Sequence, residues 1–313
     1  WELRIAGEAW LDVARPSASL VAPSEVGLRR GWDGGEIFLG AGSPAWGLSR
    51  FRSPAAAFAP RATLWSVLTG PPLGGPMAAL RLFPDWGEIE LLFLPARRAF
   101  QESRLVRRTW GGREVDPSTG LDPRADYGVR LWRSFQSADV AVWWMDGTDG
   151  RGWVRAREGE EAAVFHQPRM RQAGWEAEYV AGELVLRSEG GVMRRDGAWH
   201  SRVLAGADWF ATPYLTVFLE QGFATDAHEA ESPLVDDTLL GVEFLTERLR
   251  VEAGGAVDPR TATVHPWMGV RWVTGSRTAL EATWVGSFGS PGDEPEFALR
   301  QPGAVSIGGV WFF

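Results

Sequence analysis

The chain contains no cysteine, no lysine and no asparagine. Without cysteine there can be no disulfide, no thiolate metal site and no cysteine nucleophile. Without lysine every basic side chain is an arginine, which we interpret as the mark of a GC-rich genome. The sequence also has no apolar run near the ~20 residues that a membrane-spanning helix needs, so helical spanning is excluded.

Positive charge is also scarce, with 32 basic against 40 acidic residues and a formal net charge of −8. Nucleic-acid phosphates would repel such a chain, so we expect no nucleic-acid partner. The sequence begins at Trp1, with no Met and no charged and apolar leader. If the protein is exported, we expect that a signal peptide has been removed and that this numbering is of the mature form.

Motifs for catalysis and metal binding are missing as well. The histidines are scattered, without the His-Glu-x-x-His spacing of a metal site, and no glycine-rich phosphate loop is present. The nearest approach to a serine–histidine pair is His200-Ser201. Neighbours in a strand point to opposite faces, so these two side chains would not meet. We therefore expect no enzyme, no catalytic residue, no metal ion and no cofactor.

What the sequence does contain is tryptophan, with 18 residues, and a regular alternation of apolar and charged positions. Leu280, Ala282 and Trp284, for example, alternate with Glu281. A period of two is the signature of a β-strand with two different faces. Abundant aromatics are typical of the girdles of membrane barrels, and a tryptophan-rich soluble lectin is the alternative.

The alternating segments predict an all-β fold, a single closed antiparallel transmembrane β-barrel over residues 1–313. Each segment has the roughly ten residues that a tilted strand needs to cross a bilayer, and we expect about 16 strands, with about 14 or 18 as alternatives. Tight turns, such as Asp33-Gly34, alternate with long connections, among them residues 96–125 and 146–168. Residues 15–24 are expected to form a loop. A soluble sandwich, with its charged faces outside, is the competing fold.

Charges are costly against lipid, so the charged face of each strand must look into the barrel. The residues predicted to line this lumen are Arg4, Glu8, Arg81, Glu88, Glu90, Arg130, Glu176, Glu178, Arg187, Glu189, Arg202, Asp208, Glu220, Glu243, Arg250, Glu252, Arg271 and Glu281. Acids outnumber arginines in this set, and some pairs should form across strands. The acidic excess predicts a preference for cations. Alternatively, these charges only hydrate and brace the lumen.

Residues 43–76 stand apart because they are rich in glycine, proline, serine and alanine and show little alternation. A stretch of this length without regular structure inside a compact domain is usually either functional or wrongly assigned. We expect it to fold into the lumen as a constriction, with a surface loop as the alternative. Its notable residues are Trp46, Arg50, Arg52 and Arg61.

The last stretch, residues 303–313, alternates again and ends in aromatic residues. It resembles the C-terminal signal of bacterial outer-membrane β-barrels, which the barrel-assembly machinery reads. The resemblance implies that Val305, Ile307, Trp311 and Phe313 form an assembly signal.

Three further stretches resemble a group of Gram-negative outer-membrane barrels that includes the alginate-export porins and related uncharacterised barrels. These stretches are Ile37-Phe-Leu-Gly-Ala-Gly-Ser-Pro-Ala-Trp-Gly47, residues 80–95 and Ala207-Asp-Trp209. In that group a Gly-x-Gln-x-x-x-Trp-Gly pattern follows an early strand. Gly40, Trp46 and Gly47 match the pattern, and Gly42 stands in the place of the glutamine.

The barrel and the resemblance together imply a porin-like channel in the outer membrane of a Gram-negative bacterium, passing or exporting small or hydrophobic solutes. An acidic lumen disfavours the export of polyanions such as alginate. The alternative function is a structural barrel with a plugged lumen, which anchors a larger envelope complex. The expected partners are outer-membrane lipid, the barrel-assembly machinery and a periplasmic or envelope protein complex.

Overall fold

The computed structural model describes residues 1–11, 20–44, 46–48, 53–55, 75–95, 109–110, 113–116, 124–148, 153–155, 162–166, 169–195, 197–225, 237–258, 264–275, 278–286 and 304–312. Every regular element in these ranges is a β-strand. The expected all-β architecture is therefore confirmed. None of the described residues belongs to a helix long and apolar enough to cross a membrane.

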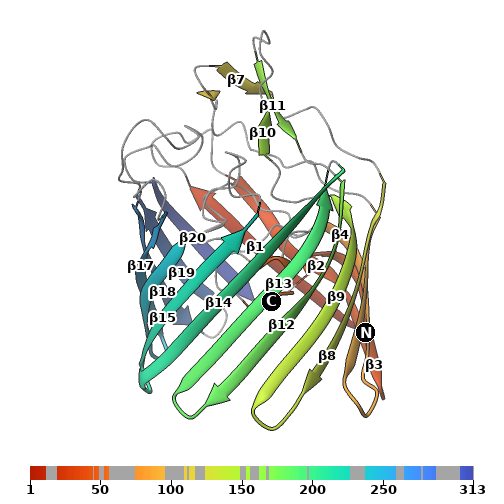
Figure 1. Ribbon diagram of the computed structural model, residues 1–313. Helices are drawn as coiled ribbons and strands as arrows, with labels where there is room; N and C mark the ends of the chain where they lie inside the picture. The colour runs from red at the N-terminus through yellow and green to blue at the C-terminus, as the bar shows by residue number, and fades with distance from the viewer. Residues whose placement is uncertain are drawn as a thin grey trace.

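Sixteen of the described strands pair antiparallel with their neighbours in one large sheet (Figure 1). β1 pairs with β2 on one side and with β20 on the other, which closes the sheet into a ring. In ring order the strands are β1 (Glu2–Leu11), β2 (Leu20–Trp32), β3 (Gly35–Gly42), β4 (Gly75–Leu82), β5 (Glu88–Leu94), β8 (Asp126–Ser134), β9 (Ala138–Thr148), β12 (Arg169–Ala181), β13 (Leu184–Arg195), β14 (Ala198–Thr212), β15 (Leu215–Ala224), β16 (Thr238–Leu245), β17 (Leu249–Val257), β18 (Val264–Gly275), β19 (Thr278–Val285) and β20 (Ala304–Phe312).

Burial alternates along the strands because successive side chains point to opposite sides of the sheet. In β9, Val140, Val142 and Trp144 are exposed, whereas Trp143 and Met145 are buried. The exposed positions form the outer face of the ring and the buried positions its inner face. The outer face is thus largely apolar, the reverse of an ordinary soluble protein surface, where large apolar patches are rare.

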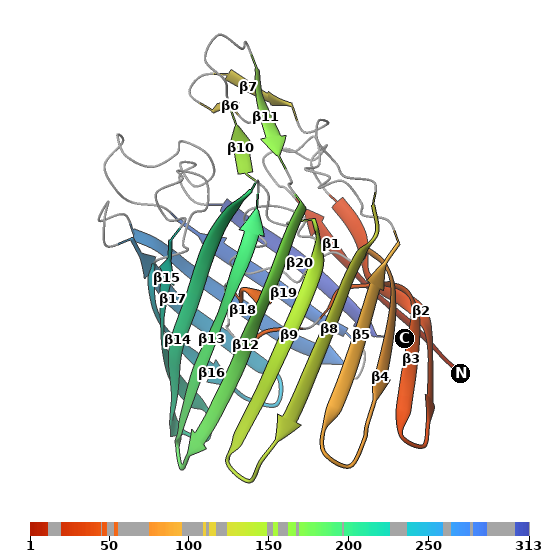
Figure 2. The ribbon, with the colours of Figure 1, turned by 45° about the vertical axis from the view of Figure 1, so that its right-hand side comes forward.

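The hairpins at one end of the ring are tight (Figure 2). The expected Asp33-Gly34 turn joins β2 to β3, with Gly34 at a φ of 84°, which an L side chain rarely adopts. Exposed aromatics gather beside these turns: Trp32, Phe83, Trp86, Phe135, Tyr179, Trp209, Phe210, Tyr214, Phe244 and Trp272. They form the girdle expected from the tryptophan content, at the turn end of the strands.

The opposite end carries structure that the sequence did not predict. Residues 96–125 and 146–168 were expected to be loops, but they contain β6 (Thr109–Trp110), β7 (Arg113–Asp116), β10 (Trp153–Arg155) and β11 (Ala162–His166). These strands form a separate four-stranded sheet above the ring, in which β11 and β7 pair parallel (Figures 1 and 2). The pairing joins two connections that are distant in sequence, and such non-local contacts leave no periodic signal.

The first connection is shorter than expected. Residues 15–24 were expected to form a loop, but β2 begins at Leu20 and includes Pro23. Proline is tolerated in a sheet at bulges, and the β1–β2 register shifts between Ala6 and Gly7, where Gly7 faces Pro23. At the far end of the ring, the β13–β14 connection is also tight, with Gly197 at a φ of 85°.

Candidate functional site

The connection between β3 and β4 enters the ring through Trp46, which is only 3% exposed. Its indole N–H donates a 2.7 Å hydrogen bond to Oε2 of Glu90, a buried residue of β5. The ring of Trp46 lies against Gly128 of β8, where an added Cβ would stand 2.7 Å from the indole. Glycine at this position therefore creates the space on the inner wall that Trp46 occupies.

Two more contacts fasten the same segment to the wall. The backbone N–H of Leu48 donates to the carboxylate of Glu189 on β13. Nε2 of Gln172, on β12, donates a 3.0 Å hydrogen bond to the carbonyl oxygen of Pro54. The strands β5, β8, β12 and β13 belong to one arc of the ring. The described part of residues 46–55 therefore lies inside the ring against that arc, as the orange trace shows (Figures 1 and 2).

An apolar cluster surrounds this segment on the inner face. It includes four of the five methionines of the chain, Met77, Met145, Met170 and Met193. Its other members are Phe38, Trp46, Ala55, Ala79, Leu92, Leu94 and Trp143. Sequence reasoning missed this cluster because it treated the charged face as wholly polar. The run of apolar residues on both faces of β9, from Val140 to Met145, is the signal that could have revealed it.

Beside the apolar cluster, charges of alternating sign form a row across four strands. Glu36 of β3 lies directly opposite Arg81 of β4, Arg81 opposite Glu90 of β5, and Glu90 opposite Arg130 of β8. The guanidinium of Arg81 lies 3.3 Å from Glu36 and 3.3 Å from Glu90. Opposite charges in directly facing positions stabilise a strand pair. Strand register therefore places each acid beside a base.

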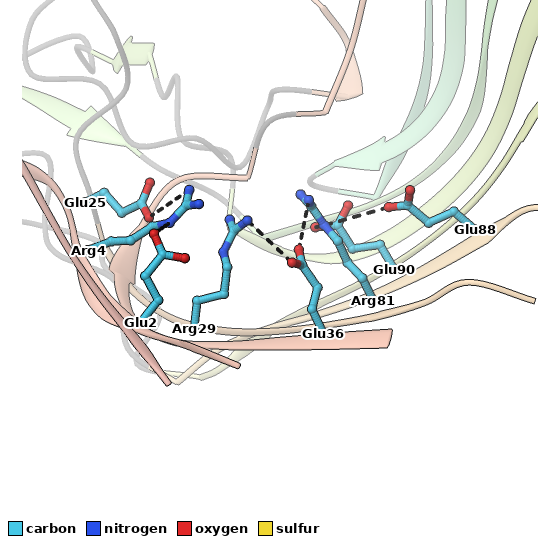
Figure 3. Close-up of polar contacts among 8 residues, drawn as sticks. All are labelled: Glu2, Arg4, Glu25, Arg29, Glu36, Arg81, Glu88 and Glu90. Carbon is cyan, nitrogen blue, oxygen red and sulfur yellow. Dashed lines mark hydrogen bonds and ion pairs between the residues drawn. The ribbon is translucent and has the colours of Figure 1, made fainter. Parts of the chain in front are cut away.

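The row of charges continues from β3 onto β2 through Arg29 and onto β1 through Arg4. Figure 3 shows Arg29, Arg81 and their acidic neighbours on one side of the sheet, the inner side. Arg29 lies 3.4 Å from Glu36, and Arg4 pairs with Glu2 at 3.2 Å. The remaining contacts of this group join Arg4 to Glu25 at 4.0 Å and Arg81 to Glu88 at 3.7 Å.

Arg130 reaches across β9 to Glu176 of β12, with nitrogen–oxygen distances of 2.6 and 3.3 Å. Farther round the ring, Arg187 contacts Glu178 at 2.8 Å and Asp208 at 2.9 Å. Similar pairs join Arg250 to Glu243 and Glu252, at 2.7 and 3.1 Å, and Arg271 to Glu281, at 3.2 Å. Arg81, Arg187 and Arg250 are thus each held between carboxylates.

The residues predicted to line the lumen all lie on the buried side of their strands, wherever their side chains are described. Six of them are fully buried: Glu90, Glu176, Glu189, Arg202, Asp208 and Glu220. Others, such as Arg4 and Arg250, are half-buried. The structure does not describe the side chain of Glu8, nor any part of Arg50, Arg52 and Arg61. The predicted assembly signal also lies outside the described residues: the side chains of Val305, Ile307 and Trp311, and all of Phe313.

A hollow of about 450 Å³, part of it open to solvent, lies where the ionic row meets the apolar cluster. Its charged lining is Glu25, Arg29, Glu36, Arg81 and Glu90. Its other lining residues are Phe38, Gly42, Ser43, Pro44, Met77 and Ala79. Acids exceed arginines in this lining, beside an apolar wall, so the hollow suits water or a small solute with positive charge. In the described ranges, no group of three or more His, Asp or Glu side chains could hold a metal ion.

Comparison with known proteins gives a match in structure only. No family model and no curated protein sequence matches the chain. An engineered triple mutant of the Rhodopseudomonas blastica porin superposes with a TM-score of 0.52 at 12% identity, covering 100% of this chain and 99% of the porin. A porin structure refined at 1.8 Å gives a TM-score of 0.51 at 12% identity and covers 100% of both chains. The chain therefore has a porin-like fold along its whole length.

Proposed function

We propose that the protein is an outer-membrane channel, a closed transmembrane barrel of sixteen strands through which small solutes pass. The observation that carries the proposal is the reversed distribution of polarity. Val142 and Leu280, for example, are 54% and 50% exposed on the outer face, while Glu90 and Glu176 are buried inside. Lipid is the solvent that suits an apolar exterior, and a closed barrel pairs every backbone group that crosses it.

In this proposal the segment around residues 46–55 narrows the channel. Its contacts with Glu90, Gln172 and Glu189 hold it against one arc of the inner wall. The solute path then runs between this segment and the opposite wall. Trp46 and the methionine-rich cluster make one side of the path apolar, and the ionic row makes the adjacent side charged.

The solute class follows from the charge of the inner wall. Acids outnumber arginines among the residues predicted to line it, and Arg81 of the ionic row is shared between Glu36 and Glu90. Rings of one sign set ion preference in a pore, so small cations and neutral solutes with apolar parts are the proposed cargo. The same charges disfavour polyanions such as alginate as cargo.

The proposed location is the outer membrane of a Gram-negative bacterium, where the exposed apolar face meets lipid. The barrel-assembly machinery is the proposed partner during insertion, with residues 303–313 as its signal. This part of the proposal rests on the resemblance of the C-terminal sequence to outer-membrane barrels and on the porin-like fold.

We expect the refolded protein to give steady single-channel conductance in a planar bilayer, with a preference for potassium over chloride. The preference should weaken as salt rises, because screening shortens the reach of the wall charges. The measurement is the reversal potential across a potassium chloride gradient. A preference for chloride would overturn the proposed acidic path.

The apolar cluster supports a second candidate, a structural barrel that anchors a larger envelope assembly. Eleven buried residues pack together on the inner face, which is also what a plug requires. A folded barrel without conductance, purified together with a protein that covers one rim, would favour this candidate over the channel.

A further inference from the structure

One row of residues on the outer face is not apolar. The row crosses five neighbouring strands, and each member lies directly opposite the next. In order they are Tyr127 of β8, Asp146 of β9, Arg171 of β12, Arg194 of β13 and Trp199 of β14. Arg171, Arg194, Tyr127 and Trp199 are exposed, with Trp199 at 68%. The register therefore sets two neighbouring arginines on the outside of the ring, with an aromatic residue at each end of the row.

The position of this row along the strands is well defined. One step nearer the tight turns, on the same face, stand Trp144, Ala173 and Val192, all exposed and apolar. The row thus marks the edge of the apolar band at the end of the ring opposite the turns. Arginine is costly at the bilayer midplane and tolerated near the interface, where tyrosine and tryptophan also gather.

The positive charge of the row is only partly compensated. One carboxylate oxygen of Asp146 accepts a 2.7 Å hydrogen bond from Nε of Arg171. The other oxygen lies 2.6 Å from Nη2 of Arg169. Within the described residues no ion pair involves Arg194. Like charges in directly opposite positions destabilise a strand pair, so an anion shared by Arg171 and Arg194 would remove a penalty. Arginine is well suited to such an anion because its planar guanidinium binds phosphate oxygens through two parallel N–H groups.

We infer that Arg171 and Arg194 bind the phosphate of a lipid headgroup, with Tyr127 and Trp199 flanking it at the membrane interface. The inference rests on the proposed function, since only a barrel in a membrane brings a headgroup to this level. It adds a lipid site on the outer face, separate from the solute path inside.

Lipid binding to the full-length barrel, refolded in detergent micelles, tests the inference by native mass spectrometry. The probes are phosphatidic acid, diacylglycerol with the same acyl chains, and inorganic phosphate. We expect phosphatidic acid to bind in preference to diacylglycerol. The R171Q/R194Q variant should bind it about tenfold more weakly, the effect of losing charge-assisted hydrogen bonds. The matched control is R248Q, because Arg248 is exposed in the tight turn between β16 and β17.

Three results would overturn the inference: equal binding of the two lipids, unchanged binding in R171Q/R194Q, or an equal loss in R248Q. If inorganic phosphate at the same concentration as the lipid displaced phosphatidic acid, the ligand would be a free anion. That result would overturn the assignment of the site to a lipid headgroup. The single variant R194Q breaks no ion pair with a described residue, so it serves if the double variant does not fold.

Conductance measured on the same preparations separates this inference from the channel proposal. R171Q/R194Q should conduct like the unmodified protein, because both side chains lie outside the ring. A barrel that conducts but does not select phosphatidic acid overturns the lipid site alone. A barrel that selects phosphatidic acid but does not conduct overturns the channel alone.

Discussion

Replacing Trp46 with alanine is expected to raise the conductance of the channel and make it fluctuate. Trp46 is 3% exposed, and its indole packs against Gly128. The indole N–H donates a 2.7 Å hydrogen bond to the carboxylate of Glu90. Truncating a buried tryptophan to alanine costs about 3 to 5 kcal/mol. A loss of about 3 kcal/mol changes the docking equilibrium of the segment roughly 100-fold. Part of the molecules should therefore lose the constriction, which single-channel recording in planar bilayers would detect.

Two variants separate the causes of this effect. W46F keeps most of the packing and removes the indole N–H, so its conductance should lie between those of the unmodified protein and W46A. W144A removes a tryptophan from the outer face, where Trp144 is 44% exposed, and should leave conductance unchanged. If W46A conducts like the unmodified protein, the segment does not restrict the path.

Replacing Arg130 with methionine is expected to lower the free energy of unfolding by about 3 to 5 kcal/mol, the usual cost of removing one partner of a buried ion pair. Arg130 contacts Glu176 at 2.6 Å, and Glu176 is only 2% exposed. Without the arginine, the carboxylate of Glu176 stays buried without this partner, and Glu90, which lies directly opposite position 130, loses a neighbouring positive charge. Urea unfolding in lipid vesicles, followed by tryptophan fluorescence, measures the change.

The double variant R130M/E176M should recover most of this stability, because it removes the uncompensated charge together with its partner. R250M is the matched control. The side chain of Arg250 is 42% exposed, so its pair with Glu243 should contribute only about 0 to 1 kcal/mol. Equal losses in R130M and R250M would mean that burial does not set the strength of these pairs.

Much of the wall could be predicted from sequence because its pattern is local. Alternation assigned Val140, Val142 and Trp144 to one face of β9, and these residues are exposed together. Asp33-Gly34 marked a hairpin because few other dipeptides suit so tight a turn. Loop residues were harder to assign. The short strands β6, β7, β10 and β11 pair only with one another, and nothing in their own sequences reports that pairing.

The sequence by itself determined that the chain forms strands with one apolar and one charged face, since a period of two depends only on neighbouring residues. Tertiary structure alone decided which charges meet. Glu36, Arg81, Glu90 and Arg130 form one row because the hairpins set the register between their strands. It also decided that Trp46 reaches Gly128, since that contact needs the ring that brings distant segments together. Face is a local property of a strand, whereas register and docking depend on the whole closed sheet.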